Sequence, residues 1–185
     1  MIYIIDHQDS FTWNVVHQFN TFDDVYCSNY FELNEKKLKD ANVIVFSPGP
    51  GSPKDYPLTS KIYKRFKGKK KIIGICLGYQ QILYNENGKI IQQRKIFHGY
   101  QSIVKVTKES SIFKKNESFK VGRYHSLKLH EPFKSKNMKI TMRCVKSDVA
   151  MAIEDIKNNV YGFQFHPESF LTQNGKIIIK KILSA

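Results

Sequence analysis

The sequence has few cysteines. Its 185 residues include three, Cys27, Cys76 and Cys144, and no two of them stand in a C-x-x-C spacing. An odd number without such a pair argues against a disulfide framework and against a zinc knuckle. We therefore expect a reducing, cytoplasmic environment.

Long apolar runs and acidic residues are scarce as well. The apolar runs span a few residues, far below the ~20 needed to cross a bilayer, so we expect no membrane association. Acidic residues number 16 against 30 Lys and Arg, which leaves a net charge of +14 and raises the question of nucleic acid. Because Lys greatly outnumbers Arg and the charge runs along the whole chain, we interpret it as a solvated surface and expect no nucleic-acid partner.

Glycine and proline are too few and too scattered to form a linker, at ten and six residues. The hydrophobic fraction of 41% is typical of a globular chain and not of a disordered one. We therefore expect one domain over residues 1–185, long enough to bury a sizeable core.

The first half alternates strand and helix patterns. Buried strands are predicted at residues 1–5, 24–28, 42–46 and 71–75. Helices are predicted at residues 11–19, 35–40, 58–66 and 78–84. This alternation predicts an α/β fold, an open and mostly parallel sheet flanked by helices, whose strand carboxyl ends share one edge.

The second half has a different pattern. Strands are predicted at residues 89–93, 101–107, 118–122, 139–145, 148–154 and 160–165, and a last helix at about 175–183. Several of these strands alternate in polarity, which favours an additional antiparallel region with one face exposed.

Cys76 stands between two glycines, in Gly74-Ile75-Cys76-Leu77-Gly78, after a buried strand and before a helix. This is a thiol version of the nucleophile elbow, in which glycines permit a sharp turn above the sheet. The positive end of the helix favours a thiolate, and the Leu77 N–H is placed to stabilise an oxyanion. A buried structural cysteine is the alternative, but strand, turn and helix together favour the nucleophile.

His166 is the candidate base for such a nucleophile. It follows the apolar run 161–165, so it reaches the same sheet edge as Cys76. Glu168, two residues later, could hold the imidazole in one tautomer and stabilise its cation. A surface histidine beside a helix-capping glutamate is the alternative.

The segment 47–53, Ser-Pro-Gly-Pro-Gly-Ser-Pro, predicts an irregular loop at the same edge. Its glycines allow backbone N–H groups to face a ligand, as in anion-binding nests. Taken alone, the loop also fits an ordinary tight connection.

Four sequence blocks occur in a fixed order: residues 46–51, 74–80, 123–127 (Arg-Tyr-His-Ser-Leu) and 162–169 (Gly-Phe-Gln-Phe-His-Pro-Glu-Ser). Together they resemble the class I glutamine amidotransferases, from residue 1 to about 183. The opening block 5–12, Ile-Asp-His-Gln-Asp-Ser-Phe-Thr, narrows the resemblance to the small glutaminase subunits of anthranilate synthase and aminodeoxychorismate (para-aminobenzoate) synthase.

The resemblance implies a Cys76–His166–Glu168 triad that hydrolyses L-glutamine to glutamate and ammonia through a thioester. It implies no metal and no cofactor in this subunit. It also implies a glutamine pocket formed by Gly49, Pro50, Gly51, Leu77, Gln80, Ser126 and Leu127. The ammonia would pass to a larger, chorismate-binding synthase subunit that makes anthranilate or 4-amino-4-deoxychorismate.

Some residues depart from the family pattern or invite another interpretation. Tyr79 and Tyr100 stand where the family commonly has His and Lys, which bears on partner coupling more than on the triad. His125 and His130 fit neither one helix face nor one strand face, so we expect no metal site there.

Two other functions account for parts of the sequence. A γ-glutamyl hydrolase or related Cys peptidase would keep the turn at Cys76, but Gln80 and the Ser126-Leu127 pair favour free glutamine. A basic nucleic-acid-binding module would use the positive charge, but the chain lacks a recognised binding motif.

Overall fold

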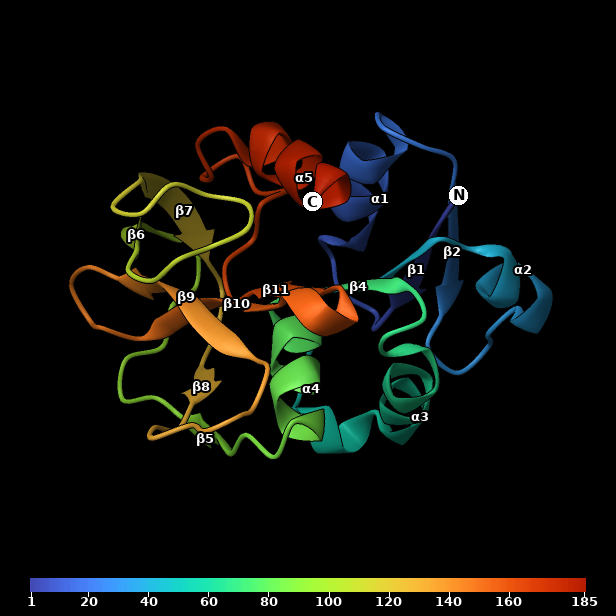
Figure 1. Cartoon of the computed structure of the whole chain (residues 1–185), viewed down its shortest axis with the longest axis horizontal. Coiled ribbons are helices and arrows are strands. Elements are labelled where there is room, and N and C mark those ends of the chain that lie inside the picture. Colours follow the sequence, from blue (N-terminus) through green and yellow to red (C-terminus); the bar gives the residue numbers. More distant parts are fainter.

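A sheet of nine strands forms the centre of the computed structural model, which describes all 185 residues (Figure 1). The parallel part runs in the order β2 (Val25–Asn29), β1 (Ile2–Asp6), β3 (Val43–Phe46), β4 (Lys71–Ile75) and β11 (Val160–Phe163). The antiparallel part continues with β10 (Ala150–Asp155), β9 (Lys139–Cys144), β6 (Tyr100–Val106) and β7 (Ser118–Arg123). Two short strands, β5 (Ile90–Gln92) and β8 (Leu127–Leu129), pair separately.

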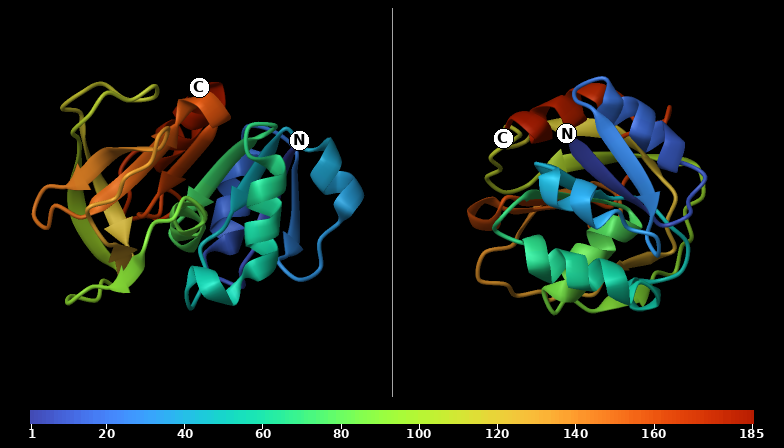
Figure 2. Two further views of the ribbon diagram at one scale, coloured as in Figure 1. Left: turned by 60° about the horizontal axis from the view of Figure 1, so that its bottom comes forward. Right: turned by 90° about the vertical axis from the view of Figure 1, so that its right-hand side faces the viewer.

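Helices cover both faces of the parallel part (Figure 2). The helices α1 (Thr12–Asn20) and α5 (Gly175–Ser184) contact each other on one face. On the other face, α3 (Pro57–Phe66) contacts α4 (Leu77–Asn85), while α2 (Glu35–Asp40) lies beside β2. Two single turns of 3-10 helix complete the structure, at Pro53–Asp55 and Ile156–Asn158.

The alternation of side chains along each central strand builds two cores. In β1, Ile2 and Ile4 join the cluster beneath α1 and α5, whereas Tyr3 and Ile5 join the cluster beneath α3 and α4. A strand buried on both faces reads as a continuous apolar run because neither set of side chains meets water. Each fully buried side chain of this size contributes about 1.5–3 kcal/mol.

The predicted α/β fold is confirmed, with a parallel sheet and an antiparallel extension in the second half. The expectation of one exposed face is wrong for β10, whose six residues are all buried. Tyr79 of α4 donates a hydrogen bond to the Ala150 carbonyl on one side of it. On the other side Glu154 accepts hydrogen bonds from Ser110 and Ser111 in the loop after β6, so both faces are covered.

The strand β8 has no counterpart among the sequence predictions. It is three residues long, Leu127–Leu129, and pairs only with β5. Three residues are too few to establish an alternating pattern, so pairing with a distant segment determines this strand.

Candidate active site

Cys76 connects β4 to α4 in the sharp turn that its sequence predicts. Its backbone adopts φ 53° and ψ −101°, a positive φ that non-glycine residues seldom adopt. Such strain persists only where the surrounding structure enforces it, and it is common at functional sites. The turn leaves the side chain in a pocket at the carboxyl edge of the sheet.

The two glycines beside Cys76 serve close packing, and neither has a positive φ. A Cβ on Gly78 would lie 2.2 Å from the carbonyl oxygen of Phe46, and a Cβ on Gly74 would lie 2.4 Å from that of Gly78. The glycines therefore let α4 approach β3 and β4, while the strained conformation belongs to the cysteine itself. This differs from the sequence-based expectation that the glycines make the turn.

His166 and Glu168 form a buried pair next to Cys76. The Nδ1 atom of His166 lies 2.6 Å from Oε1 of Glu168, and His166 is 1% exposed. Burial by itself lowers the pKa of His166, but the Glu168 carboxylate and then Cys76 outweigh it and raise the pKa well above its ordinary value. A proton on the imidazole is therefore favoured, between the Glu168 carboxylate and the sulfur of Cys76.

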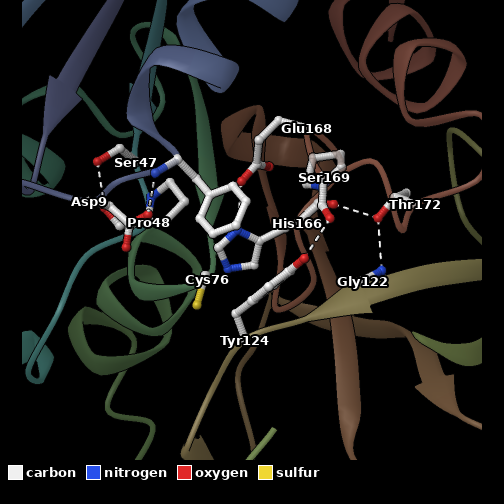
Figure 3. Close-up of polar contacts among 12 residues, drawn as sticks. Asp9, Ser47, Pro48, Cys76, Gly122, Tyr124, His166, Glu168, Ser169 and Thr172 are labelled. Carbon is white, nitrogen blue, oxygen red and sulfur yellow. Dashed lines mark hydrogen bonds and ion pairs between the residues drawn. The ribbon is translucent and has the colours of Figure 1, made fainter. Parts of the chain in front are cut away.

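The second ring nitrogen of His166 points toward the cysteine (Figure 3). This Nε2 atom has no hydrogen-bond partner of ordinary geometry, although Cys76 lies close enough to raise the pKa of the ring. In Figure 3 the imidazole lies between the carboxyl group of Glu168 and the sulfur of Cys76. The three groups thus have the arrangement of a nucleophile, a base and an orienting carboxylate.

Two aromatic rings hold the imidazole in place. The rings of Phe11 and Tyr124 lie 5.3 and 4.9 Å from that of His166, each at an interplanar angle of 65°. The His166 carbonyl also accepts a hydrogen bond from Thr172 Oγ1 at 2.5 Å, and its N–H donates to Gly122 at 3.1 Å. Side chain and backbone are therefore both fixed before a substrate arrives.

A pocket of about 290 Å³ opens above Cys76. Of the seven residues predicted for glutamine binding, six line it: Gly49, Pro50, Gly51, Gln80, Ser126 and Leu127. Leu77, His166 and Glu168 do not line it. As the first residue of α4, Leu77 has no acceptor within the helix for its N–H, and no other hydrogen bond uses it.

The loop that carries Gly49 to Gly51 is tied to β1 by a histidine that is not part of the triad. His7 Nε2 lies 2.9 Å from Thr59 Oγ1, and the His7 N–H donates to Ser47 Oγ at 2.9 Å. Burial lowers the pKa of His7 to about 4, so this ring is neutral near pH 7. Tyr56 adds a hydrogen bond from its hydroxyl to the Pro50 carbonyl at 2.9 Å.

Sequence reasoning missed part of the pocket wall. Gln8, Asp9 and Ser10 line it from the loop between β1 and α1. This loop follows the carboxyl end of a central strand, so the rule that selected residues 47–53 would also have selected it. Tyr124 and His125 line the pocket as well.

Gln164 is a further buried side chain at the site to which the sequence assigned no role. Its Nε2 lies 3.7 Å from Cys76 Sγ, and its Oε1 accepts a hydrogen bond from Gln80 Nε2 at 3.1 Å. Gln80 thus connects to Cys76 through Gln164, besides lining the pocket.

Cys27, His125 and His130 are not part of the triad, although His125 lines the pocket. Burial, with a smaller contribution from Asp6, raises the pKa of Cys27 to about 11, which disfavours its thiolate. His125 is buried and bonded within its own segment, and His130 is exposed. No group of three or more His, Cys, Asp and Glu side chains is arranged to hold a metal ion. None of the helices has the length and apolar character that crossing a membrane requires.

Comparisons with known proteins agree on one family. The sequence profile of the family "Glutamine amidotransferase class-I" matches residues 3–185. The chain is 37% identical to "Anthranilate synthase component 2" of Lactococcus lactis, over 100% of this chain and 94% of that protein. It is 33% identical to "Bifunctional protein TrpGD" of Thermotoga maritima, over 99% of this chain but 32% of that protein. Among solved structures, a GMP synthase subunit from Thermoplasma acidophilum superposes with a TM-score of 0.85 at 18% identity, covering 99% of this chain and 92% of the other.

Proposed function

Because the chain belongs to the class I glutamine amidotransferase family, we propose that it is the glutaminase subunit of a synthase. It releases ammonia from L-glutamine and delivers that ammonia to a larger subunit that binds chorismate. The relatives named anthranilate synthase component 2 support anthranilate as the product. Synthesis of 4-amino-4-deoxychorismate would use the same site and a different partner.

The proposal rests on the arrangement of Cys76, His166 and Glu168, in which the imidazole lies between the thiol and the carboxylate (Figure 3). Glu168 holds the Nδ1–H of His166, so Nε2 is the atom that takes the proton from the Cys76 thiol. The resulting thiolate and imidazolium stabilise each other, because the burial of His166 and Glu168 limits screening by water.

The reaction then proceeds in two steps. The Cys76 sulfur bonds to the side-chain carbonyl carbon of glutamine, and the carbon–nitrogen bond breaks as His166 returns its proton to the departing ammonia. Water next attacks the γ-glutamyl thioester while His166 takes its proton. Glutamate leaves, and the proton returns to the Cys76 sulfur.

Backbone N–H groups at the pocket would stabilise the negative charge that develops on the carbonyl oxygen. The Leu77 N–H is free and sits at the positive end of α4, and the Gly51 N–H in the facing loop also has no acceptor. Removing one such donor typically costs about 10²–10³ in kcat.

The test is Cys76→Ser, with Cys27→Ser as the matched control. We expect glutamate release to fall by about 10³-fold or more in the first variant and to stay near the wild-type rate in the second. A glutamine-like electrophile should also form an adduct at Cys76, which mass spectrometry locates. An unchanged rate in Cys76→Ser would refute the proposal.

The surface around the triad suggests how a partner docks. Trp13, two residues after Phe11, is 71% exposed, and Phe170, two residues after Glu168, is 88% exposed. Large exposed aromatic side chains are typical of protein interfaces. We expect slow glutaminase turnover by the chain alone and faster turnover with a chorismate-binding subunit. Full activity without a partner would instead favour a free-standing γ-glutamyl hydrolase.

A further inference from the structure

A second cavity, which we call the Arg123 cavity, lies in the antiparallel half of the molecule. Its volume is about 510 Å³, and its walls come from residues 91–95 and 97, from Ser102, Arg123 and Lys128, and from the end of β9 and the turn after it. None of the predicted catalytic or glutamine-binding residues lines it. Its size falls in the range of roughly 300–1,000 Å³ found for small-molecule sites.

The walls of this cavity carry positive charge only. The basic residues that line it are Arg94, Lys95, Arg123, Lys128 and Lys146, and none of the lining residues is Asp or Glu. None of the five forms a salt bridge with a carboxylate anywhere in the protein. Their mutual repulsion is therefore not offset by a directly paired carboxylate.

Arg123 is the deepest of these cations, at 1% exposed. Its Nε donates to His125 Nε2 at 3.0 Å, and its Nη1 donates to Cys144 Sγ at 3.4 Å. Its Nη2 has no acceptor, and the guanidinium lies 3.6 Å from the ring centroid of Phe97. Buried charges in proteins are nearly always paired, because leaving one unpaired costs several kcal/mol.

We propose that the Arg123 cavity binds a small molecule through a carboxylate or phosphate group that pairs with Arg123. The planar guanidinium suits such a group, since its donors match the spacing of two oxygens. Lys128 and Lys146 add charge, while Ser102 and Ser147 supply hydroxyls. The ring of Phe97 offers an apolar surface for the carbon skeleton of the ligand.

The cavity connects to the glutamine pocket through one histidine. Burial, reinforced by the Arg123 cation, lowers the pKa of His125 to about 3, so the ring is neutral. Its Nε2 accepts from Arg123, and its Nδ1–H therefore donates to the Leu127 carbonyl at 2.8 Å. Gln93, which also lines the cavity, donates its N–H to the Ser126 carbonyl at 2.8 Å. An anion bound to Arg123 would therefore act, through His125 and Gln93, on residues 126–127, which line the glutamine pocket.

Arginine side-chain resonances test the binding directly. The sequence holds four arginines, so each Nε–Hε signal of the intact protein can be assigned by nuclear magnetic resonance. Inorganic phosphate and benzoate are titrated in parallel at constant ionic strength, which separates a phosphate site from a carboxylate site. We expect one of them to shift the Arg123 signal saturably while the exposed Arg65, paired with Glu35 at 2.9 Å, does not respond.

Two double variants decide whether the cavity is the site. Replacing Lys128 and Lys146 by Gln should weaken the affinity about three- to tenfold, since each removes a partly screened charge. Replacing Lys61 and Lys64 by Gln, in the hollow beside α3, is the matched control and should leave it unchanged. A shift that does not saturate, or that moves Arg65 equally, overturns the proposal. Equal affinities for the two double variants would also overturn it.

The connection to glutamine is tested separately, and it rests on the proposed glutaminase function. At saturating probe, we expect KM for glutamine to change by about 5- to 150-fold, the typical range of coupling between sites. Binding at Arg123 with an unchanged KM would overturn the connection, while the binding site itself would stand. The spectroscopic measurement needs no glutaminase activity, so failure of the proposed function would not hide a ligand.

Discussion

Two of the buried histidines of this protein, His166 and His125, differ in charge, because one ring is protonated and the other is neutral. In the segment after β11, His166 faces Glu168 at 2.6 Å, and its pKa lies well above the ordinary value. In the segment after β7, His125 faces Arg123 at 3.0 Å, and its pKa falls to about 3. Burial lowers the pKa of both rings, and the Glu168 carboxylate, followed by Cys76, outweighs it only at His166.

Because the two rings differ in charge, the segments that carry them have different functions. A ring that exchanges protons with Cys76 needs a carboxylate to stabilise its cation. A ring that fixes the Leu127 carbonyl needs to stay in one neutral tautomer, and the adjacent cation keeps it there. Tyr124 joins the two segments, since it packs on His166 and shares a hydrogen bond with Ser169.

Removing the carboxylate should make His166 resemble His125. In Glu168→Gln the burial of His166 is no longer offset, so its pKa falls and the thiolate–imidazolium pair is lost. We expect kcat for glutamate release to fall by about 10³- to 10⁴-fold, the loss seen when a triad carboxylate becomes an amide.

The matched control for this change is Glu131→Gln. Glu131 also pairs with a cation, Arg143, but on the surface and away from the pocket. The kcat of the Glu131→Gln variant should stay close to the wild-type value. A Glu168→Gln enzyme that folds and retains most of its kcat would mean that the contrast between the two histidines has no catalytic role.

The second expected effect is on stability in acid. His125 and His7 have folded pKa values of about 3 and about 4, below the unfolded value of 6.5, so the unfolded chain binds more protons as the pH falls. Each should remove about 2 kcal/mol from the free energy of unfolding between pH 7 and pH 5. His166 behaves oppositely, because a raised pKa contributes stability below 6.5 that is lost as the pH rises through the folded value.

Urea unfolding at pH 7 and pH 5 measures this effect. In His125→Asn the loss of stability in acid should be smaller than in the wild type by the contribution of one histidine. His130→Asn, at an exposed position, is the control and should keep the wild-type loss. Identical losses of stability in the wild type and in both variants would contradict the conclusion that His125 is neutral in the folded protein.

The smallest expected effect concerns the link between the two segments. Tyr124→Phe removes the hydrogen bond between Tyr124 and Ser169 Oγ, which is 3.0 Å long, but keeps the ring against His166. We expect a loss of about 0.5–1.5 kcal/mol in stability with little change in kcat. Tyr84→Phe, at an exposed ring, is the control. A large fall in kcat would place the Tyr124 hydroxyl at the reaction itself.

Sequence patterns that extend over a few residues predicted most of the secondary structure of this protein. Helix α2 and strand β4 begin and end at the predicted residues, and the other predicted strands and helices lie within about two residues of theirs. The positions of Cys76, His166 and Glu168 also followed from local sequence, because Cys76 directly follows β4 and the other two lie in the short segment after β11. Their catalytic roles stay predictions until the variants are measured.

Other features depend on segments far apart in the chain. The burial of β10 requires Tyr79 from α4 and two serines from the loop after β6. The Arg123 cavity requires the turn after β9 to meet residues 91–97. The hydrophobic periodicity of one segment does not show which distant segment it will contact. These contacts could therefore not be predicted from the sequence.

The sequence by itself determined the elements, their order and the position of the turn at Cys76, because propensity and periodicity act over a few residues. Only the tertiary structure decided the charge of the two histidines. Electrostatic energy depends on distance in space and on burial, and the chain assembles both from separate segments. His125 lies two residues from Arg123 and His166 two residues from Glu168, yet each pair becomes decisive only once the fold removes it from water.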